Sequence, residues 1–283
     1  MNICLGPGIH EDTAIARYMS LPAFLYMIQF GQAFLPSIAN LRSTAGNQGD
    51  PTEGIWGVVD QMQRDGSGET LRSLIERLYG LIVEGKKYTP PLSGPTELQI
   101  PSPFGLHTIS REPGALRAFN DKECRWLDAW CWHRFRQEHM SMWRQYGAGD
   151  GAVCILTTVG RLLNSMTVSP NERAYVGKML YTRPLGLTPR KHEQYSLFLQ
   201  KMNAYEYERE IRILVYDPKS PLEESRAVPG RYVPIDMKML CDAVLVHPDA
   251  PVWIFELVTE ILESRFGRGA MPSSIQIRRE GQF

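Results

Sequence analysis

Short apolar runs of strand length are interspersed with segments of helical periodicity in this chain, and the two kinds do not alternate regularly. Gly151–Leu156 and Tyr205–Tyr216 have the length and composition of strands. Leu21–Phe30 and Val252–Phe266 carry apolar residues at helical spacing. A doubly wound or barrel fold requires repeated strand–helix–strand units, which are missing from this pattern. We therefore predict an α+β fold in which helices flank a mixed, largely antiparallel sheet.

The remaining predicted elements suggest one domain. Further strands are predicted at Thr13–Tyr18, Gln32–Ile38, Tyr175–Tyr181, Ala227–Ile235 and Ala243–His247, and the Trp-rich stretch Trp126–His133 indicates a helix end entering a buried strand. Further helices are predicted at Glu69–Lys86, Glu138–Tyr146, Thr157–Ser165 and His192–Ala204. Pro90–Pro103 has the composition of a connector, but the pieces beside it are too small to fold separately. We expect a single domain over residues 1–283, with an irregular helical insertion and linker at about 55–125.

The composition argues against several classes of binding partner and against membrane insertion. Lys+Arg and Asp+Glu number 31 each, without the basic excess of a dedicated nucleic-acid binder. The 5 cysteines are scattered and contain no C-x-x-C pair, which argues against a disulfide framework or a tight zinc site. The longest apolar windows, Leu21–Phe30 and Val252–Leu262, are too short or too interrupted to cross a bilayer. We expect a cytoplasmic protein without membrane insertion and without a bound metal.

The segment Glu206–Arg212 is the most unusual charged motif. In a strand, alternate residues face the same way, so one face would carry Glu206, Glu208, Glu210 and Arg212. Neighbours on that face lie about 7 Å apart. Repulsion would raise the pKa of at least one carboxyl, while Arg212 would hold Glu210 ionised. The motif fits either a carboxylate pair with separate acid and anion roles or a solvated sheet face with surface ion pairs, and taken alone it favours the latter.

An ordered set of motifs resembles an uncharacterised bacterial family, the domain of unknown function 2971, over almost the whole chain. The matching motifs are Arg17-Tyr18, Asp50-Pro51 with Glu53-Gly54, Glu138, Ser141-Met142-Trp143, Tyr146-Gly147, Gly151–Leu156, Val176–Tyr181, Lys201 with Tyr207–Arg212, and Val244–Pro248. The chain departs from the family at His133, where the family commonly places a small hydroxyl residue, and at Gln137–Ser141, where the usual acidic-hydroxyl dipeptide is spaced more widely. The family supplies no reaction.

The motif order is also similar, at the level of fold, to that of the ADP-ribosyltransferases. Their Arg or His on an early strand, their second strand and their late E-x-E correspond here to Arg17, Cys131–His133 and Glu208-x-Glu210. The resemblance implies an enzyme that cleaves the nicotinamide–ribose bond of NAD, with a protein or nucleic acid as acceptor, as in a toxin or a phage-defence effector. It further implies that Glu210 stabilises the ribose cation, that Glu208 orients or deprotonates the acceptor, and that Arg17 contacts a phosphate.

Other side chains complete the candidate NAD site, namely Tyr18, His133, Trp143, Tyr146 and Arg212. Trp143 and Tyr146 lie three apart on a predicted helix and could stack on a nicotinamide or adenine ring. Aromatic residues at this spacing are more often core anchors, and we favour that role for Trp143. His133 is a candidate base or ribose contact, although a histidine in apolar sequence is more often a hydrogen-bonded core residue.

Two further functions compete with NAD cleavage. Asp50 and Glu53, together with Glu208 and Glu210, are hard oxygen donors of the kind that divalent metals prefer, which would suit a nuclease-like hydrolase. The chain lacks a local basic cluster for a nucleic-acid substrate, although Lys201 and Arg212 could reach a phosphate. The other alternative is a non-catalytic binding or interaction module in which the acidic segment is structural.

Overall fold

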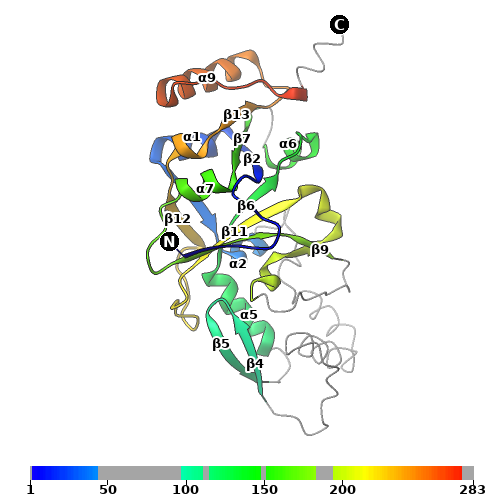
Figure 1. Ribbon diagram of the computed structural model, residues 1–283, viewed down its shortest axis with the longest axis vertical. Helices are drawn as coiled ribbons and strands as arrows, with labels where there is room; N and C mark the ends of the chain where they lie inside the picture. The colour runs from blue at the N-terminus through cyan, green and yellow to red at the C-terminus, as the bar shows by residue number, and fades with distance from the viewer. Residues whose placement is uncertain (1, 44–96, 111–114, 148–150, 183–193, 276–283) are drawn as a thin grey trace.

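A seven-stranded sheet forms the centre of the protein (Figure 1). The computed structural model describes residues 2–43, 97–110, 115–147, 151–182 and 194–275. The strands of the sheet are β1 (Asn2–Leu5), β2 (Ala14–Ser20), β6 (Asp128–Arg134), β7 (Ala152–Thr158), β8 (Arg173–Lys178), β11 (Glu210–Tyr216) and β13 (Ala243–Val246). Their order is β1-β8-β11-β6-β2-β7-β13, with β1 parallel to β8 and all other neighbours antiparallel. The predicted α+β fold with a mixed, largely antiparallel sheet is therefore confirmed.

Three two-stranded ribbons and several helices surround this sheet. The ribbons are β3 (Gln32–Pro36) with β12 (Gly230–Pro234), β4 (Glu97–Ser102) with β5 (Gly105–Ser110), and β9 (Leu180–Thr182) with β10 (Gln200–Met202). The helices are α1 (Leu21–Phe30), α2 (Ile38–Ser43), α5 (Ala115–Trp126), α6 (Met140–Tyr146), α7 (Val159–Ser165), α8 (Met237–Leu240), α9 (Val252–Phe266) and the 3-10 helices η2 (Ser196–Leu199) and η3 (Asn203–Glu208). Figure 1 shows α9 at one end of the elongated molecule and the β4–β5 ribbon with α5 at the other.

Local sequence signals account for where several helices begin and end. Ser20 accepts a hydrogen bond from a first-turn backbone N–H of α1, and Pro22 occupies the first turn, where no N–H is needed. Gly31 ends the same helix in the left-handed region, with φ of 59°. Thr158 caps α7 by accepting from the backbone N–H of Arg161. The predicted bounds of α1 and α9 agree with the structure.

One face of the central sheet is covered by α1, α7, α8 and α9. The strands and these helices share a continuous buried apolar cluster whose members include Ile15, Phe24, Trp130, Ile155, Leu162, Ile213, Leu240 and Val258. Alternate residues of each strand point into this cluster, as expected for a sheet packed against helices. This face provides the main hydrophobic core.

The opposite face carries two separate apolar clusters. One lies over β6, β8 and β11, packs against α2, α5 and η2, and includes Ile38, Leu127, Tyr175, Phe198, Leu214 and Tyr216. The other lies over β2, β7 and β13, packs against α6, and includes Ala16, Tyr18, Met142, Trp143 and Cys154. Two buried polar residues, His133 at the end of β6 and Glu210 at the start of β11, belong to neither of these apolar clusters.

Four sequence predictions about secondary structure were wrong in part. Tyr175–Tyr181 is not one strand, because it is divided between β8 and β9, which belong to different sheets. Tyr205–Tyr216 is not one strand, because Arg209 adopts the left-handed region with φ of 44° and separates η3 from β11. The described part of His192–Ala204, from residue 194 onward, contains the single turn of η2 and then β10 instead of one helix, since Gln200–Met202 pairs with β9. Pro90–Pro103 includes β4, which pairs with β5. The predicted helix at Glu69–Lys86 lies outside the described residues.

Candidate functional site

The sheet separates between β2 and β6, and this separation opens the candidate site. The register joins only Ile15 with Arg134 and Ala16 with His133 in these two strands, whereas β2 remains paired with β7 along its whole length. Just beyond the last pair, Nη1 of Arg17 donates a hydrogen bond to the backbone carbonyl of Cys131. The side chain of Arg17 thus replaces the backbone hydrogen bonds that would otherwise join β2 to β6 at this point. The two strands are therefore far enough apart for a cavity to lie between them.

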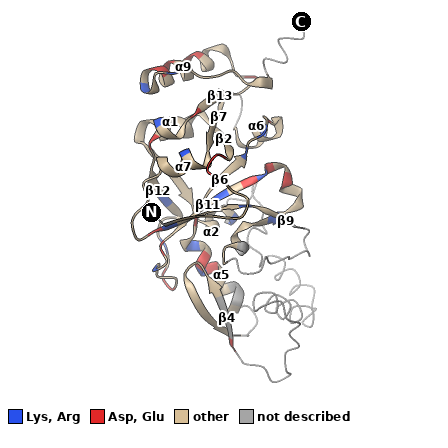
Figure 2. Cartoon of the chain, viewed as in Figure 1, with Lys and Arg blue, Asp and Glu red and all other residues tan. Residues whose placement is uncertain are grey.

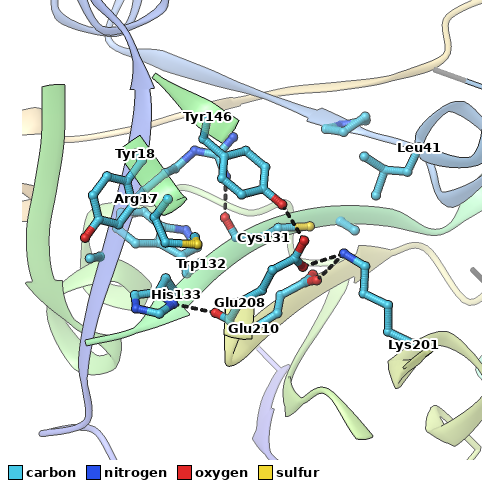
Figure 3. Close-up of a pocket in the computed structure, with 14 residues that line it drawn as sticks. Arg17, Tyr18, Leu41, Cys131, Trp132, His133, Tyr146, Lys201, Glu208 and Glu210 are labelled. Atoms are coloured by element: carbon cyan, nitrogen blue, oxygen red, sulfur yellow. Dashed lines mark hydrogen bonds and ion pairs between the residues drawn. The ribbon is translucent and has the colours of Figure 1, made fainter. Parts of the chain in front are cut away.

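A pocket of about 300 Å³ lies at this separation. It is lined by Ala16, Arg17, Tyr18, Pro36, Leu41, Ala129, Cys131, Trp132, His133, Met142, Tyr146, Lys201, Glu208 and Glu210. Most of the apolar ones belong to the two clusters of the second sheet face, Trp132 belongs to the main core of the first face, and the polar ones lie among them. Figure 3 shows how these side chains surround the pocket. The volume is at the lower end of the range for small-molecule sites, roughly 300–1,000 Å³.

Two carboxylates in the pocket share one ammonium group. Lys201 Nζ lies 2.6 Å from Glu208 Oε2 and 3.3 Å from Glu210 Oε2. The second oxygen of Glu210 accepts a hydrogen bond of 2.8 Å from Nε of Arg212. All four side chains are buried, so these ion pairs are only weakly screened by solvent. Arg212 in turn donates to the backbone carbonyl of Phe198 at 3.0 Å.

The surroundings of the two carboxyls push their pKa values in opposite directions. Burial raises the pKa of Glu208, and the charge of Glu210 adds to this increase, although the nearby Lys201 opposes it. Burial also disfavours the charge of Glu210, but Arg212 and Lys201 together outweigh burial and lower the pKa of Glu210. Glu210 is therefore a fixed anion, whereas Glu208 is the carboxyl better suited to exchanging a proton.

Helix α6 supplies a second set of contacts to Glu208. The hydroxyl of Tyr146 donates to Glu208 Oε1 at 2.8 Å, and Gln145 Nε2 lies 3.3 Å from the same oxygen. Burial, together with the negative charges of Glu208 and Glu210, raises the pKa of Tyr146. Tyr146 thus remains a protonated donor near neutral pH. The carboxyl of Glu208 is fixed by contacts from β10 and from α6 at the same time (Figure 3).

Arg17 is the cation of the pocket that pairs with no carboxylate within the described chain. The one side-chain hydrogen bond that it makes there goes to the Cys131 carbonyl, and its guanidinium lies 5.9 Å from the centre of the Trp130 ring. Burial lowers the pKa of Arg17, against the attraction of nearby negative groups. A guanidinium has five N–H donors, so Arg17 retains several that could bind an anionic ligand.

The fold brings six of the predicted site residues to the pocket wall, namely Arg17, Tyr18, His133, Tyr146, Glu208 and Glu210. Trp143 is not among the lining residues, because it is fully buried and packs edge-on against Tyr18, with ring centroids 4.8 Å apart. Arg212 also lies behind the wall, where it contacts the pocket through Glu210. Asp50 and Glu53, the other candidates for metal ligands, fall outside the described residues.

The sequence does not reveal the contacts of two important residues, Lys201 and Tyr181. The sequence indicates Lys201 only as part of a motif and as a possible phosphate contact. Its pairing with both glutamates depends on β10, a strand that the sequence does not predict. The sequence gives no sign of the contact of Tyr181, whose hydroxyl accepts a hydrogen bond of 2.6 Å from the backbone N–H of Glu210. In both cases the relevant contact joins separate elements, so no local pattern signals it.

Comparison with known proteins leaves the site to be interpreted from its geometry. No family model, curated protein or solved structure matches this chain. In the ranges that the structure describes, no group of three or more His, Cys, Asp or Glu side chains is arranged to hold a metal ion. No helix of the same ranges is long and apolar enough to cross a membrane.

Proposed function

We propose that this protein cleaves the nicotinamide–ribose bond of NAD, as an ADP-ribosyltransferase-like enzyme or an NAD glycohydrolase. One observation carries the proposal: Arg17, His133, Tyr146 and the pair of Glu208 and Glu210 come from four separate segments of the chain and line one pocket. A cleft that gathers polar residues with shifted pKa values is the usual sign of a catalytic site. The similarity in motif order to the ADP-ribosyltransferases and to the uncharacterised bacterial family points to the same residues.

The two carboxyls fit the separate roles that this reaction requires. The bond between the ribose carbon and the pyridinium nitrogen breaks, and its electron pair neutralises the ring of the departing nicotinamide. Positive charge then develops on the ribose, where the anionic Glu210 stabilises it. An O–H group of water or of an acceptor adds to the same carbon and gives its proton to Glu208, whose raised pKa suits a base.

The size and charge of the pocket suit part of the dinucleotide. A volume of about 300 Å³ is too small for a whole dinucleotide and fits the nicotinamide and its ribose. The free N–H groups of Arg17 would then bind the nearest phosphate. Water as the acceptor makes the reaction a hydrolysis, and a protein or nucleic acid as the acceptor makes it a transfer.

The test is release of nicotinamide from NAD by the purified protein, measured by chromatography. We expect release by the wild type and a decrease of at least ~100-fold in Glu210→Gln, which keeps the shape of the side chain and removes its charge. Glu206→Gln is the matched control, because Glu206 is exposed and lies four residues earlier in the same segment. Wild-type activity in a folded Glu210→Gln protein would rule out the assignment. Glu208→Gln is the second test if Glu210→Gln does not fold.

The runner-up functions lead to different results. For the metal-dependent hydrolase, the ammonium of Lys201 lies between Glu208 and Glu210, where a shared metal ion would bind, so the ion would have to displace it. A nuclease activity that is lost with chelator and restored by magnesium or manganese would support that alternative. For the non-catalytic module, glutamates paired on an open surface would be expected, whereas Glu208 and Glu210 are buried beside a pocket.

A further inference from the structure

Glu210 is held through its backbone as well as through its carboxylate. The register of β8 with β11 places Met179 opposite Glu210, and the N–H of Met179 donates to the carbonyl oxygen of Glu210 at 3.0 Å. In a regular antiparallel pair of this kind, the two residues exchange both backbone hydrogen bonds. The N–H of Glu210 instead donates to the hydroxyl of Tyr181 at 2.6 Å. A side chain thus completes the ladder at the residue proposed to stabilise the ribose cation.

The turn before Glu210 accounts for this exchange of acceptors. Arg209 is the one non-glycine residue of the described ranges whose φ is positive, at 44°. Its left-handed backbone turns the peptide group that joins it to Glu210, and the N–H of Glu210 turns with it. Glu210 is only 4% exposed, and a buried backbone N–H without an acceptor is costly. The hydroxyl of Tyr181 therefore satisfies the donor that the turn displaces.

The β9–β10 ribbon holds both ends of Glu210. Tyr181 of β9 and Lys201 of β10 are register partners in this parallel ribbon. Tyr181 contacts the backbone of Glu210, and Lys201 Nζ lies 3.3 Å from its Oε2. Arg212, two residues later on β11, donates to the other carboxylate oxygen at 2.8 Å. Any shift of the Glu210 backbone would therefore move its carboxylate relative to both cations.

Tyr181 acts on the pocket only through Glu210. It is not among the residues that line the pocket, so it makes no contact with a ligand there. Burial raises the pKa of Tyr181, and the charges of Glu210 and Glu208 add to this increase, so the hydroxyl stays neutral. We infer that Tyr181 is a positioning residue, whose hydroxyl fixes the backbone of Glu210 and thereby sets the carboxylate against its two cations. Its effect on NAD cleavage rests on the proposed function.

The first test measures NAD cleavage by the full chain. Tyr181→Phe removes the hydroxyl and keeps the ring. We expect kcat to fall at least ~10-fold while KM stays within ~2-fold, because a displaced Glu210 loses stabilisation that is needed only in the transition state. Tyr195→Phe is the matched control. It removes a hydroxyl that lies 2.6 Å from that of Tyr216, in the same buried cluster against which Tyr181 packs, and it should keep the wild-type kcat.

The second test measures the position of the carboxylate without any activity. Although burial opposes them, Arg212 and Lys201 lower the pKa of Glu210 to about 2. In Tyr181→Phe the carboxylate should lie less favourably against these cations, so we expect the pKa of Glu210 to rise by at least ~1. Carbon NMR of isotope-labelled glutamate, followed as the pH is lowered, gives this value. Tyr195→Phe should leave the pKa of Glu210 unchanged, which a general loss of stability does not distinguish from the wild type.

Three results would overturn the positioning role. They are an unchanged kcat in Tyr181→Phe, an unchanged pKa of Glu210 in that variant, and an equal loss of kcat in Tyr195→Phe. If the wild type cleaves no NAD, the proposed reaction is wrong, and the pKa of Glu210 alone decides the role of Tyr181. If Tyr181→Phe does not fold, Tyr181→Met replaces it in both tests, since the flexible methionine side chain also lacks the hydroxyl and adapts to the space of the ring.

Discussion

Lys201 Nζ lies 2.6 Å from Glu208 Oε2, and both side chains are almost completely buried. Because Glu210 contacts the same ammonium, the cation holds two carboxyls that would otherwise repel each other in a low-dielectric site. A buried ion pair adds little stability by itself, but removing one partner leaves a buried charge uncompensated. We therefore expect removal of Lys201 to affect both stability and the proposed division of roles between the glutamates.

Removal of the Lys201 charge should destabilise the fold. We expect Lys201→Met to lower the free energy of unfolding by about 3–5 kcal/mol, because the carboxylates lose their shared partner. Urea unfolding near neutral pH measures this change. Lys219→Met is the control, since Lys219 is exposed, and should stay within about 0.5 kcal/mol of the wild type. A loss of less than 1 kcal/mol in Lys201→Met would show that the pair is not compensating buried charge.

The pH dependence of NAD cleavage should follow the ionisation of Glu208. The base must be ionised to accept a proton, and its pKa is raised above the ordinary value of 4.5, so kcat/KM should rise with pH through a midpoint above 4.5. Lys201 opposes that increase in pKa, so Lys201→Met should move the midpoint to still higher pH. The measurement is the pH profile of nicotinamide release. A midpoint that stays in place in the variant would argue against Glu208 as the base.

Glu123 should make the stability of the protein depend on pH. Burial raises its pKa from 4.5 to about 8, against the hydrogen bond from Ser102. Because the folded state binds this proton more tightly, the contribution of Glu123 to stability is complete below pH 4.5 and is lost as the pH rises to about 8. Glu123→Gln does not titrate, so its stability relative to the wild type should improve by a few kcal/mol over that window.

Urea unfolding of Glu123→Gln and wild type at pH 5 and pH 8.5 checks this expectation. Glu224→Gln is the control, because Glu224 is exposed, and its difference from the wild type should be the same at both pH values. The prediction is refuted if the difference between Glu123→Gln and the wild type does not change with pH.

Glu138 should stabilise the helix that carries Tyr146. Its carboxylate accepts hydrogen bonds from Trp143 Nε1 at 3.2 Å, from Ser273 Oγ at 2.6 Å and from the backbone N–H of Ser274 at 2.6 Å. The residue thereby ties residues 273–274 to α6. Hydrogen bonds to a charged group contribute about 1.5–3 kcal/mol each, so Glu138→Ala should lower the free energy of unfolding by at least ~2 kcal/mol.

Chemical denaturation of Glu138→Ala and Ser273→Ala tests this arrangement. Ser273→Ala removes one of the bonds and should cost less than Glu138→Ala. Glu256→Ala, a change of the same type at an exposed position of α9, should have an effect below about 0.5 kcal/mol. Equal stability of Glu138→Ala and Glu256→Ala would indicate that the contacts of Glu138 contribute nothing measurable.

The sequence predicts elements well where the signals are local. Ser20, Pro22 and Gly31 define α1 within a few residues, so its bounds follow from capping and periodicity. Strand alternation predicts that Glu208 and Glu210 lie on the same face of one strand. In the structure, Glu208 instead lies in η3, before Arg209, whose backbone is in the left-handed region. Their convergence instead depends on Lys201, which arrives from a separate strand. Such contacts between distant segments leave no periodic pattern in the sequence.

Asp128 illustrates the same limit outside the pocket. It is fully buried at the start of β6 and forms ion pairs with Arg226 and Arg231, which approach from the segment around β12. Arg231 also pairs with Glu172. In the sequence these are isolated charged residues, and only the three-dimensional arrangement makes them a buried network.

The strand order of the central sheet affects when the protein can fold during its synthesis. β2 leaves the ribosome long before β6 and β7, with which it pairs, and β1 must wait for β8. When β6 has emerged, its other neighbour β11 has still to be made. The nascent chain therefore exposes apolar strand surface for an extended period, as expected for a sheet built from distant segments. Because Glu208 and Glu210, which line the pocket, belong to this late portion, the complete pocket can form only in a chain that has been translated beyond them.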